Sequence, residues 1–259
     1  MKTVIALGDL HCGHIAGLMP HGWIKNQSEF ESLHKLESEM LRAYATWTRK
    51  FARPDLLIVN GDLIEGKGRK SGGTELVTSD REEQAGMAVK LLKMWNPKKC
   101  IITYGTSYHS GEEEDWERWV AKDMDCEIHN HAQFEIAGIV FDVKHHLSNS
   151  TMPHTKGTPL AREILHNLLW TEAEGCERAD IVLRSHVHNY FHCDSVNWDA
   201  FSLPGLQAPS HNKYGGRSCS QVVNFGILGI QINERNGSWG YDKSNIISLE
   251  SAKLKLIKF

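Results

Sequence analysis

The sequence predicts a single α/β domain, because apolar, β-branched runs alternate with amphipathic helical segments along the chain. The 259 residues are 41% hydrophobic and 24% charged, enough to bury a substantial core without requiring more than one domain over residues 1–259. A second observation is that several apolar runs stop at Gly-Asp or at histidine. In open α/β sheets, ligands bind at the carboxyl ends of the strands. The pattern therefore predicts a functional site as well as a fold class.

The N-terminal part of the chain predicts a β-strand, a crossover helix and a second β-strand. Residues 3–7 form an apolar run that ends at a Gly-Asp pair containing Asp9. Apolar residues at helical spacing over 28–51 predict a long amphipathic helix. The run over 55–59 then leads into a second Gly-Asp pair, which contains Asp62. A crossover of this kind implies that the two strands are parallel.

The middle of the chain continues this alternation. Residues 66–80 are polar and glycine-rich without periodicity, so we expect an exposed, mobile loop that overhangs the second Gly-Asp pair. A helix over 81–94 and a strand over 100–104 are predicted next. The loop after that strand carries His109, and residues 112–122 predict a short acidic helix.

The last elements follow the same logic. Residues 136–144 predict a strand that leads into two histidines, and residues 159–170 predict a helix. A strand over 179–184 leads into Ser-His-Val-His. From residue 201 onward, short apolar runs separated by Gly, Asn and Ser predict hairpins that complete a second, more antiparallel sheet.

Composition restricts the class of protein. No apolar run approaches the length needed to cross a bilayer, and the first residues do not resemble a signal peptide. The six cysteines are scattered without a CxxC pair, which favours a reducing compartment. A net charge of −3 argues against a dedicated nucleic-acid binder. We therefore expect a cytoplasmic protein with no membrane association.

Five successive strand ends carry a carboxylate or an imidazole group. Each motif is weak alone, but carboxyl ends of strands converge on one crevice, so we expect these side chains to meet. They are Asp9 with His11, Asp62, His109, His145 with His146, and His186 with His188.

These residue types indicate a centre for divalent metal ions. Carboxylate and imidazole together favour zinc, manganese or iron over calcium, which prefers oxygen ligands alone. The set is larger than one ion needs. Two ions about 3.5–4 Å apart would use it fully and would clamp the attacking and leaving oxygens of a phosphoryl group. The sequence therefore predicts hydrolysis of phosphate esters.

The order of the motifs over residues 9–188 resembles the calcineurin-like metallophosphoesterase superfamily. The resemblance implies a four-layer α/β/β/α sandwich of two mixed sheets and two divalent ions of manganese, iron, zinc or nickel. It also implies that a hydroxide bridging the two ions attacks the phosphorus of a phosphomonoester or phosphodiester. The implied ligands are Asp9 and His11 on the first ion, Asp62 between the ions, His186 on the second, His188 on the first, and His145 in preference to His146.

The third motif departs from the family pattern. The family usually has Gly-Asn-His, whereas this chain has Gly-Thr-Ser-Tyr-His from Gly105 to His109. Either Thr106 or His109 replaces the missing Asn ligand, and both alternatives stay open here. Alternatively, His109 keeps the acid role and acts with Asp62 as a catalytic residue. We expect Glu112 or Asp115 to orient it.

Two further departures concern the neighbouring motifs. Ser185 replaces the usual glycine of Gly-His-x-His, and we expect little consequence. The segment after Asp62 lacks the Asp-Arg-Gly of the serine/threonine protein phosphatases, which disfavours that branch. His14 and His211 lie in loops that could reach the crevice.

The expected partner is a phosphate-ester substrate, and the oligomeric state stays open. Nucleotides or nucleic-acid ends are possible substrates because the loop after Asp62 carries Lys67, Arg69 and Lys70, although a solvated loop would have the same composition. The alternative is a non-catalytic interaction scaffold that keeps the metallophosphoesterase fold, as some relatives do. The missing Asn supports this alternative, whereas the other retained ligands argue against it.

Overall fold

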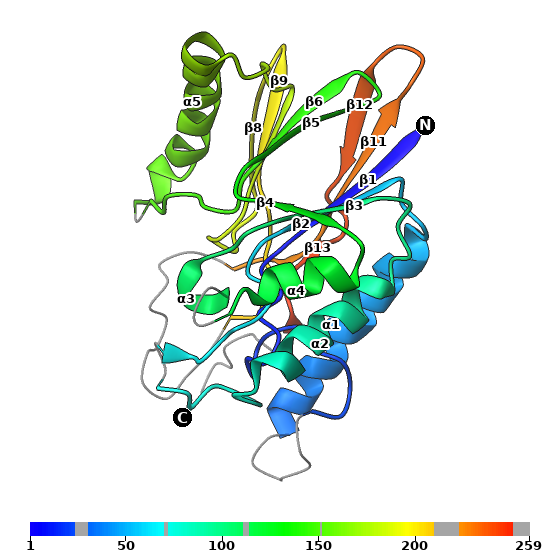
Figure 1. Cartoon of the computed structure of the whole chain (residues 1–259), viewed down its shortest axis with the longest axis vertical. Helices are drawn as coiled ribbons and strands as arrows, with labels where there is room; N and C mark the ends of the chain where they lie inside the picture. The colour runs from blue at the N-terminus through cyan, green and yellow to red at the C-terminus, as the bar shows by residue number, and fades with distance from the viewer. Residues whose placement is uncertain (24–30, 70–71, 111–113, 151, 210–222, 251–259) are drawn as a thin grey trace, which may run out of the picture.

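The computed structural model describes residues 1–23, 31–69, 72–110, 114–150, 152–209 and 223–250. Two β-sheets pack face to face, and helices cover the outer face of each sheet (Figure 1). The predicted α/β class and the four-layer sandwich are therefore confirmed.

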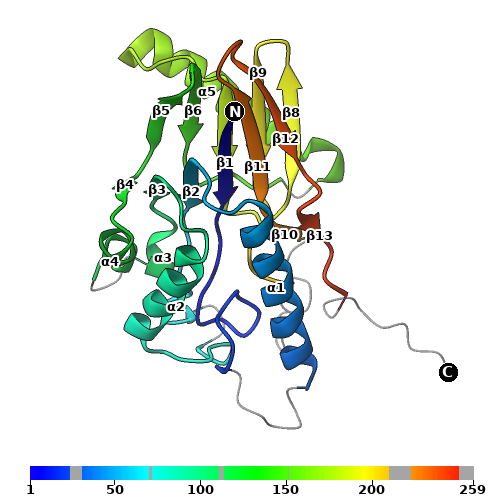
Figure 2. The same ribbon diagram turned by 90° about the vertical axis from the view of Figure 1, so that its right-hand side faces the viewer.

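The first sheet has six strands in the order β12-β11-β1-β2-β3-β4. Helix α1 (Glu31–Lys50) crosses between β1 and β2, and these strands are parallel as predicted. The expectation that the C-terminal strands belong to the second sheet is wrong, because β11 pairs antiparallel with β1 (Figure 2). The strands are β1 (Lys2–Leu7), β2 (Leu56–Asn60), β3 (Cys100–Thr103), β4 (Glu127–His129), β11 (Leu228–Asn233) and β12 (Ser238–Asp242).

The second sheet has five strands in the order β5-β6-β7-β9-β8. The strand predicted within residues 136–144 is confirmed as β6, and it begins after Ala137 and Gly138, which both have positive φ and form a two-residue hairpin turn between β5 and β6. The hairpin of β8 and β9 was not predicted. The strands are β5 (Ala132–Ile136), β6 (Ile139–Val143), β7 (Ile181–Arg184), β8 (Phe191–Ser195) and β9 (Trp198–Ser202).

The helices divide between the two outer faces. Helices α1 and α2 (Arg81–Lys93) bury apolar faces against the first sheet, and α5 (Thr158–Glu174) packs on the second. Short helix α3 (Ser107–Ser110) follows β3. The predicted acidic helix begins later than expected, as α4 (Trp116–Asp123), because the Asp115 side chain caps its N-terminus.

The core between the sheets aligns the strand ends. Side chains such as Val4 and Ile58 of the first sheet pack against Phe141 and Leu183 of the second. Burying each such side chain stabilises the fold by about 1.5–3 kcal/mol. The packing therefore brings the carboxyl ends of β1, β2 and β3 to the same end of the sandwich as that of β6 (Figure 1). Strand β7 runs parallel beside β6 and ends at the same side.

The remaining segments include a 3-10 turn, η3 (Pro153–Thr155), and two short strands, β10 (Phe225–Gly226) and β13 (Ile246–Ile247), which pair with each other.

The loop after Asp62 is not simply exposed as expected. The Val77 N–H donates to the Gly13 carbonyl at 2.8 Å, and the Ile15 N–H donates to the Glu75 carbonyl at 2.9 Å. Residues 75–77 therefore lie against the loop that follows β1 and contains His11. No helix within the described ranges is long and apolar enough to span a membrane.

Candidate metal centre

The loops after β1 and β2 are held together by their own backbones. The Asp9 N–H donates to the Gly61 carbonyl at 2.9 Å, and the His11 N–H donates to the Asp62 carbonyl at 3.1 Å. Gly61 has a φ of 74°, and a Cβ there would lie 2.5 Å from His145 Nδ1. Glycine before Asp62 is therefore required by both the backbone conformation and the close approach of His145.

The backbone at five candidate ligands has positive φ. This conformation is rare for residues other than glycine and costs of order 1–3 kcal/mol each. Such conformations concentrate at functional sites, where the surrounding structure holds them. The five residues are Asp9 (52°), His11 (47°), Asp62 (52°), His186 (76°) and His188 (50°).

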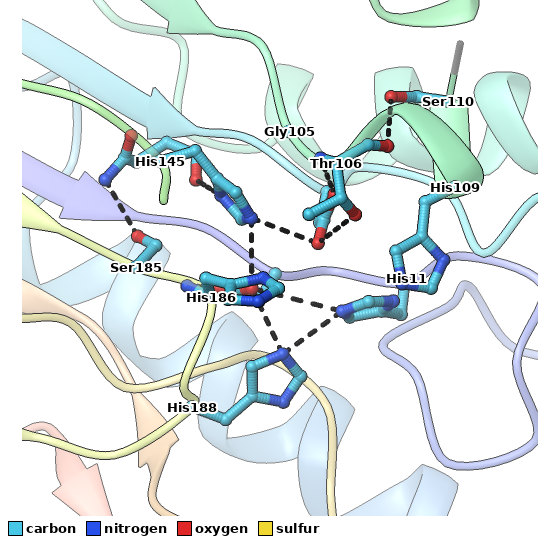
Figure 3. A network of polar contacts seen from close by, with 12 residues as sticks. His11, Gly105, Thr106, His109, Ser110, His145, Ser185, His186 and His188 are labelled. Atoms are coloured by element: carbon cyan, nitrogen blue, oxygen red, sulfur yellow. Dashed lines mark hydrogen bonds and ion pairs between the residues drawn. The ribbon is translucent and has the colours of Figure 1, made fainter. Parts of the chain in front are cut away.

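Asp9, His11 and His188 form a first cluster, in which one ligand atom of each residue lies within 4.8 Å of the others. His188 Nε2 lies 3.1 Å from Asp9 Oδ1, and His11 Nε2 lies 3.2 Å from His188 Nε2 (Figure 3). All three residues come from the loops after β1 and β7. The fold therefore brings His11 and His188, which are 177 positions apart in the sequence, into contact.

Asp62, His145 and His186 form a second cluster of the same compactness. His145 Nε2 lies 3.1 Å from Asp62 Oδ2 and 4.0 Å from Asp9 Oδ1, so this imidazole stands between the two clusters. The aspartates are completely or almost completely buried. Asp62 is placed where one carboxylate could contact ions in both clusters.

The third motif contributes Thr106 and His109 on different sides of Asp62. The Thr106 N–H donates to Asp62 Oδ1 at 2.6 Å, and its hydroxyl donates to the same oxygen at 2.9 Å. His109 instead groups with His11 and Asp62, and its ring lies 4.6 Å from that of His11 (Figure 3). The ligand role of each residue stays a prediction.

Hydrogen bonds to oxygen acceptors orient three of the imidazole rings. His11 Nδ1 lies 2.8 Å from Glu65 Oε2, His109 Nδ1 lies 2.9 Å from the Glu65 carbonyl, and His145 Nδ1 lies 2.7 Å from the Asn60 carbonyl. We infer that each Nδ1 carries the proton, because an oxygen acceptor requires a donor. Each Nε2 then keeps its lone pair for a metal ion.

The arrangement leaves acceptor atoms facing one another. With its proton on Nδ1, His145 directs a lone pair at the Asp62 carboxylate, and His11 directs one at His188. Asp9 Oδ1 and His145 Nε2 are buried and form no hydrogen bond with any described residue. A proton or a cation between these atoms would remove the repulsion. The donor set is carboxylate and imidazole, so the residues fit divalent transition-metal ions.

The pKa values show how strongly the site attracts positive charge. Burial would lower the pKa of His145, but the Asp62 carboxylate outweighs it and raises that pKa to about 10. Burial would raise the pKa of Asp62, but the charge of His145 holds it far below the usual range. Burial, with a smaller effect of His145, lowers the pKa of His186 to about 4. The aspartates thus stay ionised and His186 stays neutral, as metal ligands must be, whereas His145 without a metal ion carries a second proton, on Nε2, which a bound ion would displace.

Ser185 makes a hydrogen bond that glycine could not make. The Asn60 side-chain amide donates to Ser185 Oγ at 2.8 Å, while the Asn60 carbonyl accepts the His145 ring. Asn60 ends a strand of the first sheet and Ser185 follows a strand of the second. The hydroxyl therefore joins the two sheets directly beneath the two clusters.

We expect the Ser185→Gly variant to be about 1 kcal/mol less stable than the wild type, because Asn60 Nδ2 loses its short acceptor and keeps only the Lys144 carbonyl at 3.3 Å. Urea unfolding of the two metal-free proteins measures this difference. Ser195→Gly, at an exposed end of a hairpin strand, is the control. Equal midpoints for Ser185→Gly and wild type would show that the hydroxyl has no structural role.

Several other residues were expected to support His109 or to reach the crevice. Asp115 does not orient His109, because it accepts from the Arg118 N–H and the Tyr104 hydroxyl, and Glu65 holds His109 instead. His146 is exposed and stacks on His186, and His14 lies 3.5 Å from Glu75, outside the two clusters. Glu112, Lys70 and His211 lie outside the described residues.

The supporting residues Glu65, Asn60 and Glu117 were missed by the sequence analysis. Asn60 and Glu65 lie within three residues of Asp62, and this proximity was the available signal. Glu117 carried none, because it is one of five acidic residues among the six positions 112–117.

Three solved structures resemble this chain. A novel archaeal phosphodiesterase matches 93% of this chain and 99% of its own, with 12% identity and a TM-score of 0.47. Wild-type Vps29 from Entamoeba histolytica, complexed with Zn²⁺, matches 93% and 97%, with 11% identity and a TM-score of 0.44. A predicted phosphoesterase from Streptococcus pneumoniae TIGR4 matches 93% and 97%, with 10% identity and a TM-score of 0.38.

Neither protein-family models nor curated protein sequences gave a match to this chain. TM-scores below 0.5 describe only a loosely shared path of the chain, so no residue role follows from these structures. Support for the expected metallophosphoesterase fold comes from the sheets and side-chain clusters of this molecule itself. Its four layers and the clustering of its strand-end motifs agree with what the sequence resemblance to the calcineurin-like metallophosphoesterase superfamily implies.

Proposed function

We propose that this protein is a dinuclear metal-dependent phosphoesterase that hydrolyses phosphomonoesters or phosphodiesters. The observation that supports it most is the pair of adjoining clusters, with Asp62 between them and imidazole lone pairs directed inward. A structural site for one ion would need only three or four ligands, and the two clusters together offer six or more. Paired cations are the arrangement that serves in-line displacement at phosphorus.

Each residue has a distinct part in this proposal. Asp9, His11 and His188 would hold one ion, His145 and His186 the other, and Asp62 both. When bound, the ions would lower the pKa of coordinated water and neutralise charge on the phosphoryl oxygens. Glu65 keeps the rings of His11 and His109 in place, and His109, when both of its ring nitrogens are protonated, would donate the Nε2 proton to the leaving oxygen.

The substrate class is a further part of the proposal. Lys67 and Arg69 are exposed on the loop after Asp62, so a substrate with more than one phosphate, such as a nucleotide or a nucleic-acid end, would find positive charge beside the clusters. The scattered cysteines support a cytoplasmic location.

Metal analysis combined with turnover tests the proposal. The purified protein, incubated with Mn²⁺ or Zn²⁺ and desalted, is expected to retain about two ions per chain. It should hydrolyse p-nitrophenyl phosphate or bis-p-nitrophenyl phosphate, and EDTA should stop the reaction. Two bound ions without turnover on either ester would favour the non-catalytic scaffold, which the missing Asn of the third motif supports. Absence of bound metal would contradict both the centre and the enzyme.

We expect His109→Ala to separate the two roles open to His109. As a proton donor it would contribute about 10²–10⁴-fold to kcat for a poor leaving group, and much less for p-nitrophenolate, which leaves without a proton. kcat on a phenyl and a p-nitrophenyl ester, with the metal content of each protein, measures the difference. An equal loss on both esters, together with loss of an ion, would contradict the acid role.

A further inference from the structure

Glu117 is a completely buried carboxylate on helix α4. Its Oε1 accepts the Leu63 N–H at 3.1 Å, and its Oε2 accepts the Gly105 N–H at 2.7 Å. Burying a charged group is costly unless both oxygens are satisfied. The two backbone N–H groups therefore account for its presence in the core.

The two bonded amides stand directly beside site residues. Leu63 follows Asp62, and Gly105 precedes Thr106. A Cβ on Gly105 would lie 2.2 Å from Asp62 Oδ1, so the third motif loop touches the Asp62 side chain. From this position Thr106 donates both its N–H and its hydroxyl to Asp62 Oδ1.

The strand ladder does not hold these loops together. The pairing of β2 with β3 ends at Asn60 and Thr103, and both chains continue beyond it as loops. Leu63 and Gly105 thus present backbone N–H groups past the last ladder bond, where buried donors need another partner. Glu117 supplies one acceptor to each loop. This single side chain therefore connects the two loops beyond the point where the hydrogen bonds between β2 and β3 stop.

We propose that Glu117 is a positioning residue. It joins the loop after β2 to the loop after β3, so that Thr106 orients the Asp62 carboxylate between the two clusters of candidate metal ligands. This inference rests on the proposed dinuclear function. Loss of the connection would displace Asp62 and weaken the second ion most, because His145 and His186 would be its only other ligands within a cluster. The first ion would keep Asp9, His11 and His188.

Two variants separate the charge of Glu117 from its reach. Glu117→Gln offers one acceptor oxygen instead of two, and Glu117→Asp keeps the charge on a shorter side chain. Glu37→Gln is the matched control, because Glu37 is also buried on a helix but does not contact either loop. Metal-free wild type and variants are compared by amide hydrogen exchange at Leu63 and Gly105 and by calorimetric titration with Mn²⁺.

We expect both Glu117 variants to lose protection at one or both amides and to bind the second ion about 10–100-fold more weakly, with the first ion retained. Excess Mn²⁺ should restore kcat. Wild-type protection and two ions of unchanged affinity in either variant would overturn the inference. So would equal weakening of both ions, which indicates general loosening. A wild-type protein that binds fewer than two ions would instead contradict the proposed function, and the exchange result would still stand.

Discussion

Replacing Asp62 with asparagine is expected to lower kcat by about 10³-fold and to release one of the two bound ions. Asp62 lies in two of the three candidate groups, one with His11 and His109 and the other with His145 and His186. Asparagine keeps the shape and can still accept from Thr106, but it loses the charge that bridges cations. A cation contributes several kcal/mol to transition-state stabilisation, and each 1.4 kcal/mol is a factor of ten.

Turnover of bis-p-nitrophenyl phosphate and metal content per chain are the two measurements for Asp62→Asn. Asp199→Asn is the control, because Asp199 is a partly buried carboxylate that contacts His192 and accepts from Trp239, away from the clusters. If Asp62→Asn retained two ions and wild-type kcat, the bridging role and the proposed mechanism would both be wrong.

Arg184→Met is expected to destabilise the protein by about 3–5 kcal/mol, because it removes the buried guanidinium from two carboxylates, which keep cationic partners such as His131 and Lys144 among the ion pairs of the described residues. Arg184 is completely buried, and it contacts Asp142 Oδ1 at 2.6 Å and Glu163 Oε2 at 2.7 Å. Arg184 directly precedes Ser185 and the loop that carries His186. Its contacts with Asp142 and Glu163 therefore also anchor the second cluster. Urea unfolding at neutral pH measures the loss.

The loss in Arg184→Met should depend on pH with a defined sign. Burial alone would raise the pKa of Glu163, but Arg184 outweighs it and lowers that pKa below 4.5. Burial alone would likewise raise the pKa of Asp142, but the hydrogen bond of His131 and the charge of Arg184 lower it below 3.8. A lowered carboxyl pKa stabilises the fold above the unfolded value, and this stabilisation disappears as pH falls through the folded value. The difference from wild type should therefore be full at pH 7 and shrink below about pH 4. A difference that grew on acidification would contradict the ion pair.

The strand ends were predictable because they carry two independent signals. A β-branched apolar run marks a buried strand, and the Gly-Asp pair at its end marks both the turn and a carboxylate. Asp9 and Asp62 combine these signals, so the first βαβ unit and the meeting of the two aspartates followed from local sequence. His186 and His188 were predictable for the same reason, because they follow the apolar strand β7.

The partners of the later strands were not predictable, since pairing depends on contacts between distant segments. Strand β11 has the same apolar character in either sheet, and its place beside β1 is decided by packing in the whole core. Likewise, Ala137 and Gly138 make a turn inside a run that is apolar on both sides. Glu117 was hidden because its role depends on two backbone amides, which leave no trace in a residue pattern.

The left-handed backbone at Asp9, His11, Asp62, His186 and His188 has a consequence for engineering this protein. Glycine would relieve the torsional penalty at each of these positions, so a screen for heat resistance alone would favour it there. The most heat-resistant mutants would then carry no metal-binding side chains at the centre. Attempts to stabilise the protein should leave these five positions unchanged and alter the outer faces of α1 and α5.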